Sequence, residues 1–133
     1  IAGPKARFGI TPAKLVLVYP LHDTKLLVDL VGPSQAKRIL FTGALLPAAE
    51  AQAIGMVTII DADPAAALER LVADLIAASG HSQRLSKAMV QRILDGQAHD
   101  DDATRAEFAA AFDGPDFAEG VSAFLEKRKP VFR

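Results

Sequence analysis

The sequence GMVTIIDADPAAALERLVADLIA, residues 55–77, contains the clearest strand signal of the chain, followed directly by one of its clearest helix signals. β-Branched residues dominate Met56–Ile60, and a glycine before it and an aspartate-rich turn after it bound a predicted strand. Asp63 before Pro64 is typical of a helix N-cap followed by proline in the first turn. Apolar residues then recur on one helical face: Leu68, Leu71, Val72, Leu75 and Ile76. A strand followed by an amphipathic helix indicates an α/β fold.

Helix signals also occupy the chain on both sides of this stretch. A helical pattern begins at Asp23 and should stop at Gly32-Pro33, because proline breaks a helix. Further helices are expected at 35–41, at 47–54, from Ser82, from Asp100 and from Asp116. We expect the last helix to bury four apolar side chains, namely Phe117, Val121, Phe124 and Leu125. One clear strand thus stands among about seven helices, with its only candidate partner near residue 7.

Composition and charge exclude several classes of protein. The chain has 133 residues, 15 lysines and arginines, 16 aspartates and glutamates, and a formal net charge of −1, so a nucleic-acid binder with a basic face is not expected. The absence of cysteine excludes disulfide scaffolds and thiolate metal sites and suits a cytoplasmic location. The longest run without a charge, 39–49, is too short to cross a bilayer, so no membrane contact is expected.

No histidine or carboxylate cluster predicts a metal site. His22, His81 and His99 lack the i, i+4 spacing of a helical metal site, and we interpret them as surface residues. The run Asp100-Asp101-Asp102 lacks the glycine and the distal glutamate of a calcium loop. Aspartates at a helix start cap free N–H groups, so the run is interpreted as a helix cap.

Two other segments leave alternatives open. In the segment Glu126–Lys129, a basic last turn could offset the negative helix end, or Lys127 or Arg128 could bind a phosphate beside Phe124. Tyr19, the only tyrosine, is either a packed aromatic or a hydrogen-bond donor in a pocket.

Five motifs, taken together and in order, resemble the enoyl-CoA hydratase (crotonase) superfamily. The resemblance covers nearly the whole chain. The motifs are ARFGITPAKL at 6–15, LVG at 30–32, AKRILFTG at 36–43, AAEAQAIGMV at 48–57 and FAEGVSAFLEKRKP at 117–130. Members of the family are about twice as long, so the chain resembles their C-terminal half and the missing sheet would lie upstream.

The resemblance implies a fold and a division of the chain. It implies an α/β protein that is the C-terminal portion of the crotonase ββα spiral, mostly helical with few strands. Residues 1–64 would end the spiral core, and residues 65–133 would form a helical region for oligomerisation and CoA capping. It also implies an acyl-CoA substrate, no cofactor beyond coenzyme A, a homotrimer or hexamer, and an N-terminal half that could be a separate chain.

The resemblance further implies chemistry through a thioester enolate, held by two backbone N–H groups that match no position here. Pro12 stands where hydratases have their second catalytic glutamate, which places hydration by paired carboxylates in doubt. Thr11 followed by Tyr19 is similar to the methylmalonyl-CoA decarboxylase branch, in which the matching tyrosine helps hold the substrate carboxylate. Val16 departs from that pattern, because the family usually has glycine there.

Thr11 and Tyr19 are therefore the catalytic candidates. Phe124 and Lys127 match the family's contacts to the CoA adenine and phosphates. The alternative is that the 133-residue chain is an inactive fragment that serves only in oligomerisation and in binding the CoA tail.

Overall fold

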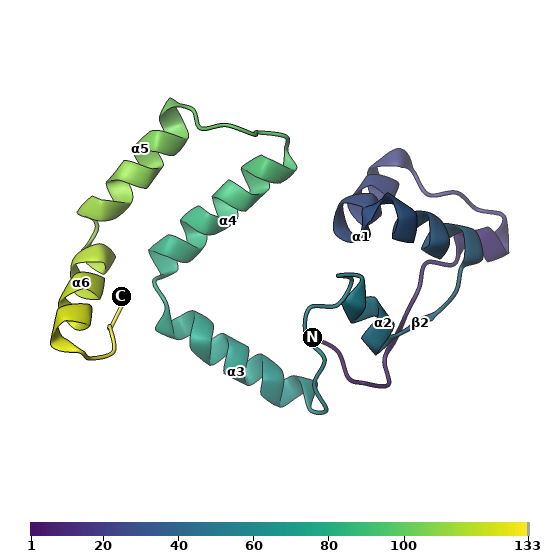
Figure 1. Cartoon of the computed structure of the whole chain (residues 1–133), viewed down its shortest axis with the longest axis horizontal. Helices are drawn as coiled ribbons and strands as arrows, with labels where there is room; N and C mark the ends of the chain where they lie inside the picture. The colour runs from purple at the N-terminus through teal and green to yellow at the C-terminus, as the bar shows by residue number, and fades with distance from the viewer. Residues whose placement is uncertain (133) are drawn as a thin grey trace. The chain divides into compact units, whose positions relative to one another are not determined.

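The structure, a computed structural model, describes residues 1–132 and consists mainly of helices (Figure 1). The α-helices are α1 Leu21–Thr42, α2 Ala48–Ala53, α3 Pro64–Ala77, α4 Gly80–Leu94, α5 Asp102–Ala110 and α6 Pro115–Glu126. Two short 3₁₀ helices, η1 and η2, span Pro12–Leu15 and Ala111–Asp113, and two short strands, β1 and β2, span Arg7–Phe8 and Leu46–Pro47. The expected class, a mostly helical α/β fold with few strands, is confirmed.

The chain divides into two compact units, each of which is described by itself. Unit 1 comprises Ile1–Glu69, and unit 2 begins at Arg70. The division falls inside α3, five residues after the boundary expected from the sequence, which lies between residues 64 and 65 at the start of this helix. The roles assigned to the two parts remain predictions.

A small two-stranded sheet joins the N-terminal segment of unit 1 to the segment before α2. β1 and β2 pair antiparallel, with Arg7 opposite Pro47 and Phe8 opposite Leu46. The Arg7 guanidinium adds a hydrogen bond from Nη2 to the carbonyl oxygen of Leu45, 3.2 Å long. The candidate strand near residue 7 therefore pairs with Leu46–Pro47, directly before α2, and not with the predicted strand at Met56–Ile60.

The predicted strand at Met56–Ile60 is wrong apart from its last residue. The N–H groups of Met56 and Val57 both donate to the carbonyl oxygen of Ala51, at 2.9 and 3.2 Å, so they complete the end of α2. Only Ile60 forms a bridge, parallel to Ala2. A strand needs a neighbour along its length, and residues 1–132 provide one at a single position.

The predicted interruption at Gly32-Pro33 is confirmed. α1 consists of two helices joined across a kink, where Gly32 has φ 77° and ψ 160°. Proline at position 33 cannot donate a backbone hydrogen bond, and glycine tolerates the positive φ that turns the chain. The second half of α1 ends on Gly43 in the left-handed region, whose N–H donates to the carbonyl oxygen of Ile39 at 3.0 Å.

The core of unit 1 forms around the kinked helix. Its largest fully buried side chain is Ile39. The buried residues of this cluster are Leu27, Val31, Ala36, Ile39 and Leu46. A second, smaller cluster joins the N-terminal segment to α2 through Ala2, Ala51 and Val57. The two clusters fix α1, α2 and the segment before η1 in one unit.

Unit 2 is held by polar contacts and by a row of aromatic rings. The Ser79 hydroxyl accepts a hydrogen bond from the N–H of Ser82 and donates to Asp116, so the start of α4 is tied to the start of α6. The α4 helix therefore begins at Gly80, two residues before the predicted Ser82. The rings of Phe108, Phe112 and Phe117 meet edge to face, with centroids 5.1 and 5.2 Å apart.

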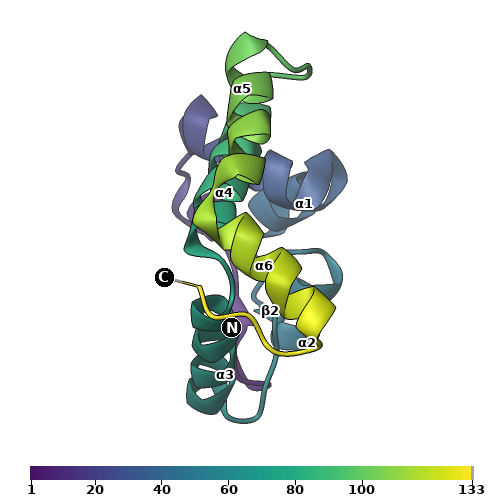
Figure 2. The same ribbon diagram turned by 90° about the vertical axis from the view of Figure 1, so that its left-hand side faces the viewer.

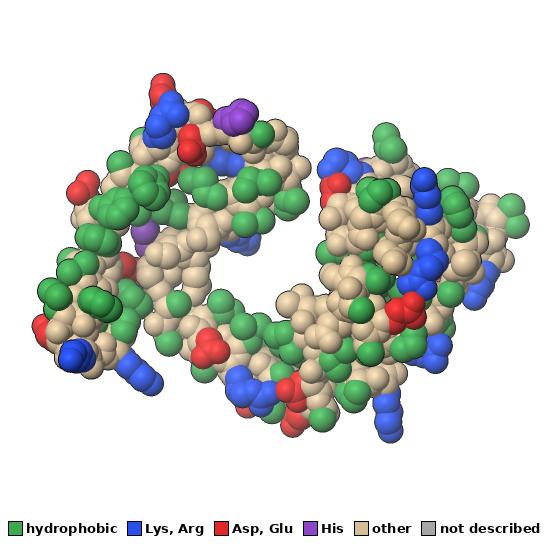
Figure 3. Space-filling view, viewed as in Figure 1, with side chains coloured by type: hydrophobic (Ala, Val, Ile, Leu, Met, Phe, Trp, Pro, Cys, Tyr) green, Lys and Arg blue, Asp and Glu red, His purple; other side chains and the backbone are tan. Residues whose placement is uncertain are grey.

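The expectation that α6 buries four apolar side chains is wrong for this unit. Phe124 and Leu125 are 82% and 73% exposed, and Phe117 and Val121 are about half exposed. Figure 3 shows apolar side chains gathered on the visible face of this unit. An amphipathic pattern identifies a face that favours burial but does not identify the surface that covers it.

Among residues 1–132, no helix is both long enough and apolar enough to span a lipid bilayer.

Replacing Ile39 by alanine should lower the free energy of unfolding by about 2–5 kcal/mol, because the buried side chain leaves a cavity. Phe41→Ala is the matched control, since Phe41 lies in the same helix and is 73% exposed. The control should change the stability by at most about 0.5 kcal/mol. Urea unfolding of the two variants checks this, and equal losses would contradict the assigned core.

Candidate functional site

Tyr19 lies at the edge of a cavity in unit 1. The cavity has a volume of about 310 Å³ and is mainly aliphatic. Its lining residues are Ile10, Tyr19, Asp23, Thr24, Leu26, Leu27, Leu30 and Leu40. Such a cavity is at the lower end of the sizes of ligand pockets, which combine apolar walls with a few polar groups. Asp23, the carboxylate that lines this cavity together with Tyr19, was not indicated by any sequence motif.

Thr11, the other catalytic candidate, does not line this cavity. Thr11 is exposed and precedes η1, where its carbonyl oxygen accepts a hydrogen bond from the N–H of Lys14 at 3.1 Å. Pro12 follows as the first residue of η1 and is partly buried. The structure thus places Tyr19 beside a pocket, whereas Thr11 takes part in the turn that leads to it.

Val16 adopts a backbone conformation that suits glycine. It ends η1 with φ 56° and ψ 31°, in the left-handed region, and its side chain is 95% exposed. A β-branched residue is disfavoured there because Cβ approaches the following carbonyl oxygen. This conformation explains why the family that the sequence resembles usually has glycine at this position. It also means that a residue with a strained backbone lies three positions before Tyr19.

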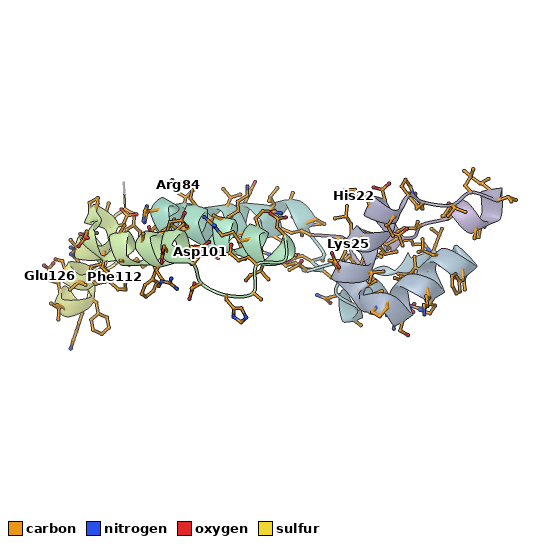
Figure 4. All side chains as sticks on the ribbon, turned by 90° about the horizontal axis from the view of Figure 1, so that it is seen from above. His22, Lys25, Arg84, Asp101, Phe112 and Glu126 are labelled. Atoms are coloured by element: carbon orange, nitrogen blue, oxygen red, sulfur yellow. The ribbon has the colours of Figure 1, made fainter. Side chains whose placement is uncertain are left out.

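The two basic residues at the end of α6 have different environments. Arg128 pairs with Glu119 through both terminal nitrogens, one of them 3.0 Å from Oε2, and with Glu126 through Nε at 2.7 Å. Lys127 lies between the two partners Glu126 and Arg128, and its ammonium has no hydrogen-bond or ion-pair partner among residues 1–132. Figure 4 shows Glu126 at the end of α6. Of the two side chains that could bind a phosphate, Lys127 and Arg128, only Lys127 is therefore available to do so within the described residues.

These ion pairs shift the titration of the groups involved. Hydrogen bonds from Arg128 and from the N–H of Val131 lower the pKa of Glu119 to about 2. The Arg128 guanidinium also lowers the pKa of Glu126, and the two carboxylates raise the pKa of Arg128. All three groups therefore stay charged throughout the neutral pH range.

Phe124 lines a second cavity, in unit 2, of about 360 Å³. The surrounding side chains include three further phenylalanines and His81, and the residues are Ser79, His81, Ser82, Ala111, Phe112, Asp116, Phe117, Gly120, Val121, Phe124 and Phe132. His81, expected at the surface, is partly buried: its Nε2 is inaccessible to solvent and has no hydrogen-bond partner among the described residues. No sequence spacing indicated this, since the cavity joins residues from 79 to 132.

The aspartate run acts as a helix cap, as predicted. Asp101, labelled in Figure 4, is the N-cap of α5. Its side chain accepts a hydrogen bond from the N–H of Thr104, and the Thr104 hydroxyl accepts one from the N–H of Asp101. The backbone hydrogen bond from Thr104 lowers the pKa of Asp101. Among residues 1–132, no group of three or more histidine, aspartate or glutamate side chains could hold a metal ion.

Comparison with known proteins gives one consistent family. A Thermus thermophilus protein assigned to the enoyl-CoA hydratases is 38% identical over 133 residues, covering 96% of this chain and 51% of the relative. The methylmalonyl-CoA decarboxylase of Escherichia coli is 30% identical over 141 residues, covering 99% of this chain and 52% of the relative. An enoyl-CoA hydratase/isomerase family protein from Hyphomonas neptunium has a TM-score of 0.87 at 36% identity, covering 96% of this chain and 50% of that structure.

The chain spans about half the length of the curated relatives it matches. The family described as enoyl-CoA hydratase/isomerase matches residues 1–133, the full sequence. The order of the five motifs, the helical α/β fold and this match together show that the chain belongs to the enoyl-CoA hydratase/isomerase family.

Proposed function

We propose that this chain forms the C-terminal half of a crotonase-type enzyme that acts on acyl-CoA through a thioester enolate. The similarity in fold to family members, over about half of their length, supports this proposal. The assignment to the C-terminal half rests on the order of the motifs, which end with FAEGVSAFLEKRKP at 117–130. The two oxyanion-hole N–H groups and the first glutamate of the hydratases would then be supplied by the other half.

The observation that carries the proposed chemistry is the position of Tyr19 at the edge of an aliphatic cavity. The segment before Tyr19 has Pro12 where hydratases have a glutamate. Proline cannot exchange a proton, so water addition by paired carboxylates is disfavoured. Decarboxylation needs no general base, because loss of CO₂ leaves the electron pair on the enolate. The decarboxylase among the relatives makes such a reaction a second candidate, with Tyr19 as donor and Thr11 in its supporting turn.

The α6 end of the chain would bind the CoA tail. Phe124 is exposed beside a cavity large enough for a ring. One turn later, Lys127 offers an ammonium that has no partner within residues 1–132. Charge-assisted hydrogen bonds to phosphate favour such an ammonium. In the family pattern this site often binds the CoA of a neighbouring subunit, so we propose a homotrimer or hexamer. We also propose a cytoplasmic location, which the absence of cysteine suits.

The alternative function is a non-catalytic module for oligomerisation and CoA-tail binding. The exposed apolar side chains of α6, Phe124 and Leu125 among them, favour a role in association.

An intact-mass measurement of the purified protein distinguishes the two functions. The enzyme proposal predicts that a companion polypeptide of similar size accompanies the 14.1 kDa chain, or that a larger single chain contains it. The 14.1 kDa species alone, without turnover of acyl-CoA, would support the non-catalytic module instead.

Tyr19→Phe, made in the complete enzyme, should lower kcat about tenfold or more while changing CoA affinity little, because it removes one hydroxyl at the reacting end. Steady-state kinetics and CoA titration measure the two effects. Phe8→Tyr is a control that adds a hydroxyl outside this cavity and should leave kcat nearly unchanged. Unchanged turnover in Tyr19→Phe would remove Tyr19 from the site.

Lys127→Ala should weaken CoA about fivefold to tenfold and dephospho-CoA less, since it removes a charged contact to phosphate. Lys87→Ala is the matched control, because Lys87 is an exposed lysine on α4. Isothermal titration of both ligands gives the comparison. An equal loss for the two ligands would rule out the 3′-phosphate as the partner of Lys127.

A further inference from the structure

The carboxylate of Glu119 ties the C-terminal tail back to α6. It accepts hydrogen bonds from both terminal nitrogens of Arg128, and its Oε1 accepts one from the N–H of Val131 at 2.7 Å. Figure 2 shows the chain turning back after the end of α6. Residues 127–131 therefore form a loop that is closed by one side chain from the middle of the helix.

Arg128 has no donor left for a ligand. Its Nε donates to Glu126, Nη1 donates to Glu119 and to the carbonyl oxygen of Lys129, and Nη2 donates to Glu119 and to the hydroxyl of Ser122. A guanidinium has five N–H donors. All of them are engaged within α6 and the tail, so Arg128 acts on the site only through its neighbours.

Lys127 is held in a conformation that an L-residue rarely adopts. Its φ is 54° and its ψ is 37°, and the helix ends there through hydrogen bonds from Lys127 N–H to Phe124 and from Arg128 N–H to Ala123. Glycine is the usual residue at this position. A strained residue persists where the surroundings fix it, and here Glu126 and Arg128 fix both flanks.

We propose that Glu119, Arg128 and Glu126 form a clamp that positions Lys127 for the phosphate of the CoA tail. This inference rests on the proposed function and adds positioning residues to it. The clamp acts in two ways. It sets the direction in which the lysine leaves the helix, and the Arg128 guanidinium engages two carboxylates that would otherwise attract the Lys127 ammonium or repel the phosphate more strongly.

The three side chains of the clamp, Glu119, Glu126 and Arg128, are charged at neutral pH. Glu119 faces Arg128 in the tail and shares a cavity with Asp116, while Glu126 faces Arg128 and Ser122. The lowered pKa of Glu119, about 2, means that its contribution is complete above pH 4.5 and is lost as pH falls toward 2. The clamp should therefore be constant between pH 6 and pH 9.

The test compares two clamp variants, Arg128→Gln and Glu119→Gln, with Lys127→Ala and with the control Arg84→Gln, an exposed arginine on α4. Each clamp variant should weaken CoA about fivefold to tenfold and dephospho-CoA less, although neither residue contacts the phosphate. The Cα chemical shift and the backbone coupling constant of Lys127, measured by NMR at pH 7, should leave the left-handed range in both. Arg84→Gln should change neither quantity.

Three results would overturn the clamp. The first is full CoA affinity in both clamp variants while Lys127→Ala binds CoA more weakly. The second is a Lys127 backbone that stays left-handed in both clamp variants. The third is an equal loss of affinity for CoA and for dephospho-CoA. If Lys127→Ala leaves CoA affinity unchanged, the proposed CoA site is wrong. A shifted Lys127 signal in Arg128→Gln and Glu119→Gln would then still show that these residues fix the backbone of Lys127. Thermal unfolding of each variant separates loss of fold from loss of position, and Glu126→Gln replaces any variant that does not fold.

Discussion

The packing of α1 around Ile39 is the interaction on which the first unit depends. The helix bends at Gly32-Pro33, and its second half places Ile39 against Leu46 of β2. Its first half contributes Leu27 both to this core and to the wall of the Tyr19 cavity. Ile10 and Leu40 also pack against this core and line the cavity, so a change that loosens the core reaches the candidate site through several side chains.

The helices of this chain could be predicted well because their signals are local. The stop at Gly32-Pro33, the cap at Asp101 and the start of α3 at Pro64 follow from backbone sterics and from hydrogen bonds between near neighbours. The strand at Met56–Ile60 could not be predicted in the same way. β-Branched residues favour extended backbone, but a ladder depends on a second segment, which here is Ala2 alone.

The candidate site divides along the same line. The resemblance in motifs indicated Tyr19 and Lys127. Tyr19 lines a cavity, and Lys127 has no ion-pair partner in the part of the chain that the structure describes. The motifs could not indicate that all the donors of Arg128 are engaged, because its partner Glu119 lies nine residues earlier in the chain. The N–H of Val131 donates to the same carboxylate. Asp23 and His81 were missed for a related reason, since a cavity is formed by side chains that come together only in the folded chain.

The two non-glycine residues with positive φ, Val16 and Lys127, are the only ones among residues 1–132, and each lies next to a candidate site. Val16 ends the turn before Tyr19, and Lys127 ends the helix after Phe124. In both places a glycine would satisfy the backbone with less strain. At Lys127 the side chain has a proposed use, and the ion pairs of Glu119 and Glu126 offset the strain by holding Arg128. At Val16 the side chain is exposed, and no ion pair lies beside it among the described residues. The N–H of Val16 donates to the carbonyl oxygen of Pro12, so the hydrogen bonding of the short turn holds this residue in the left-handed region.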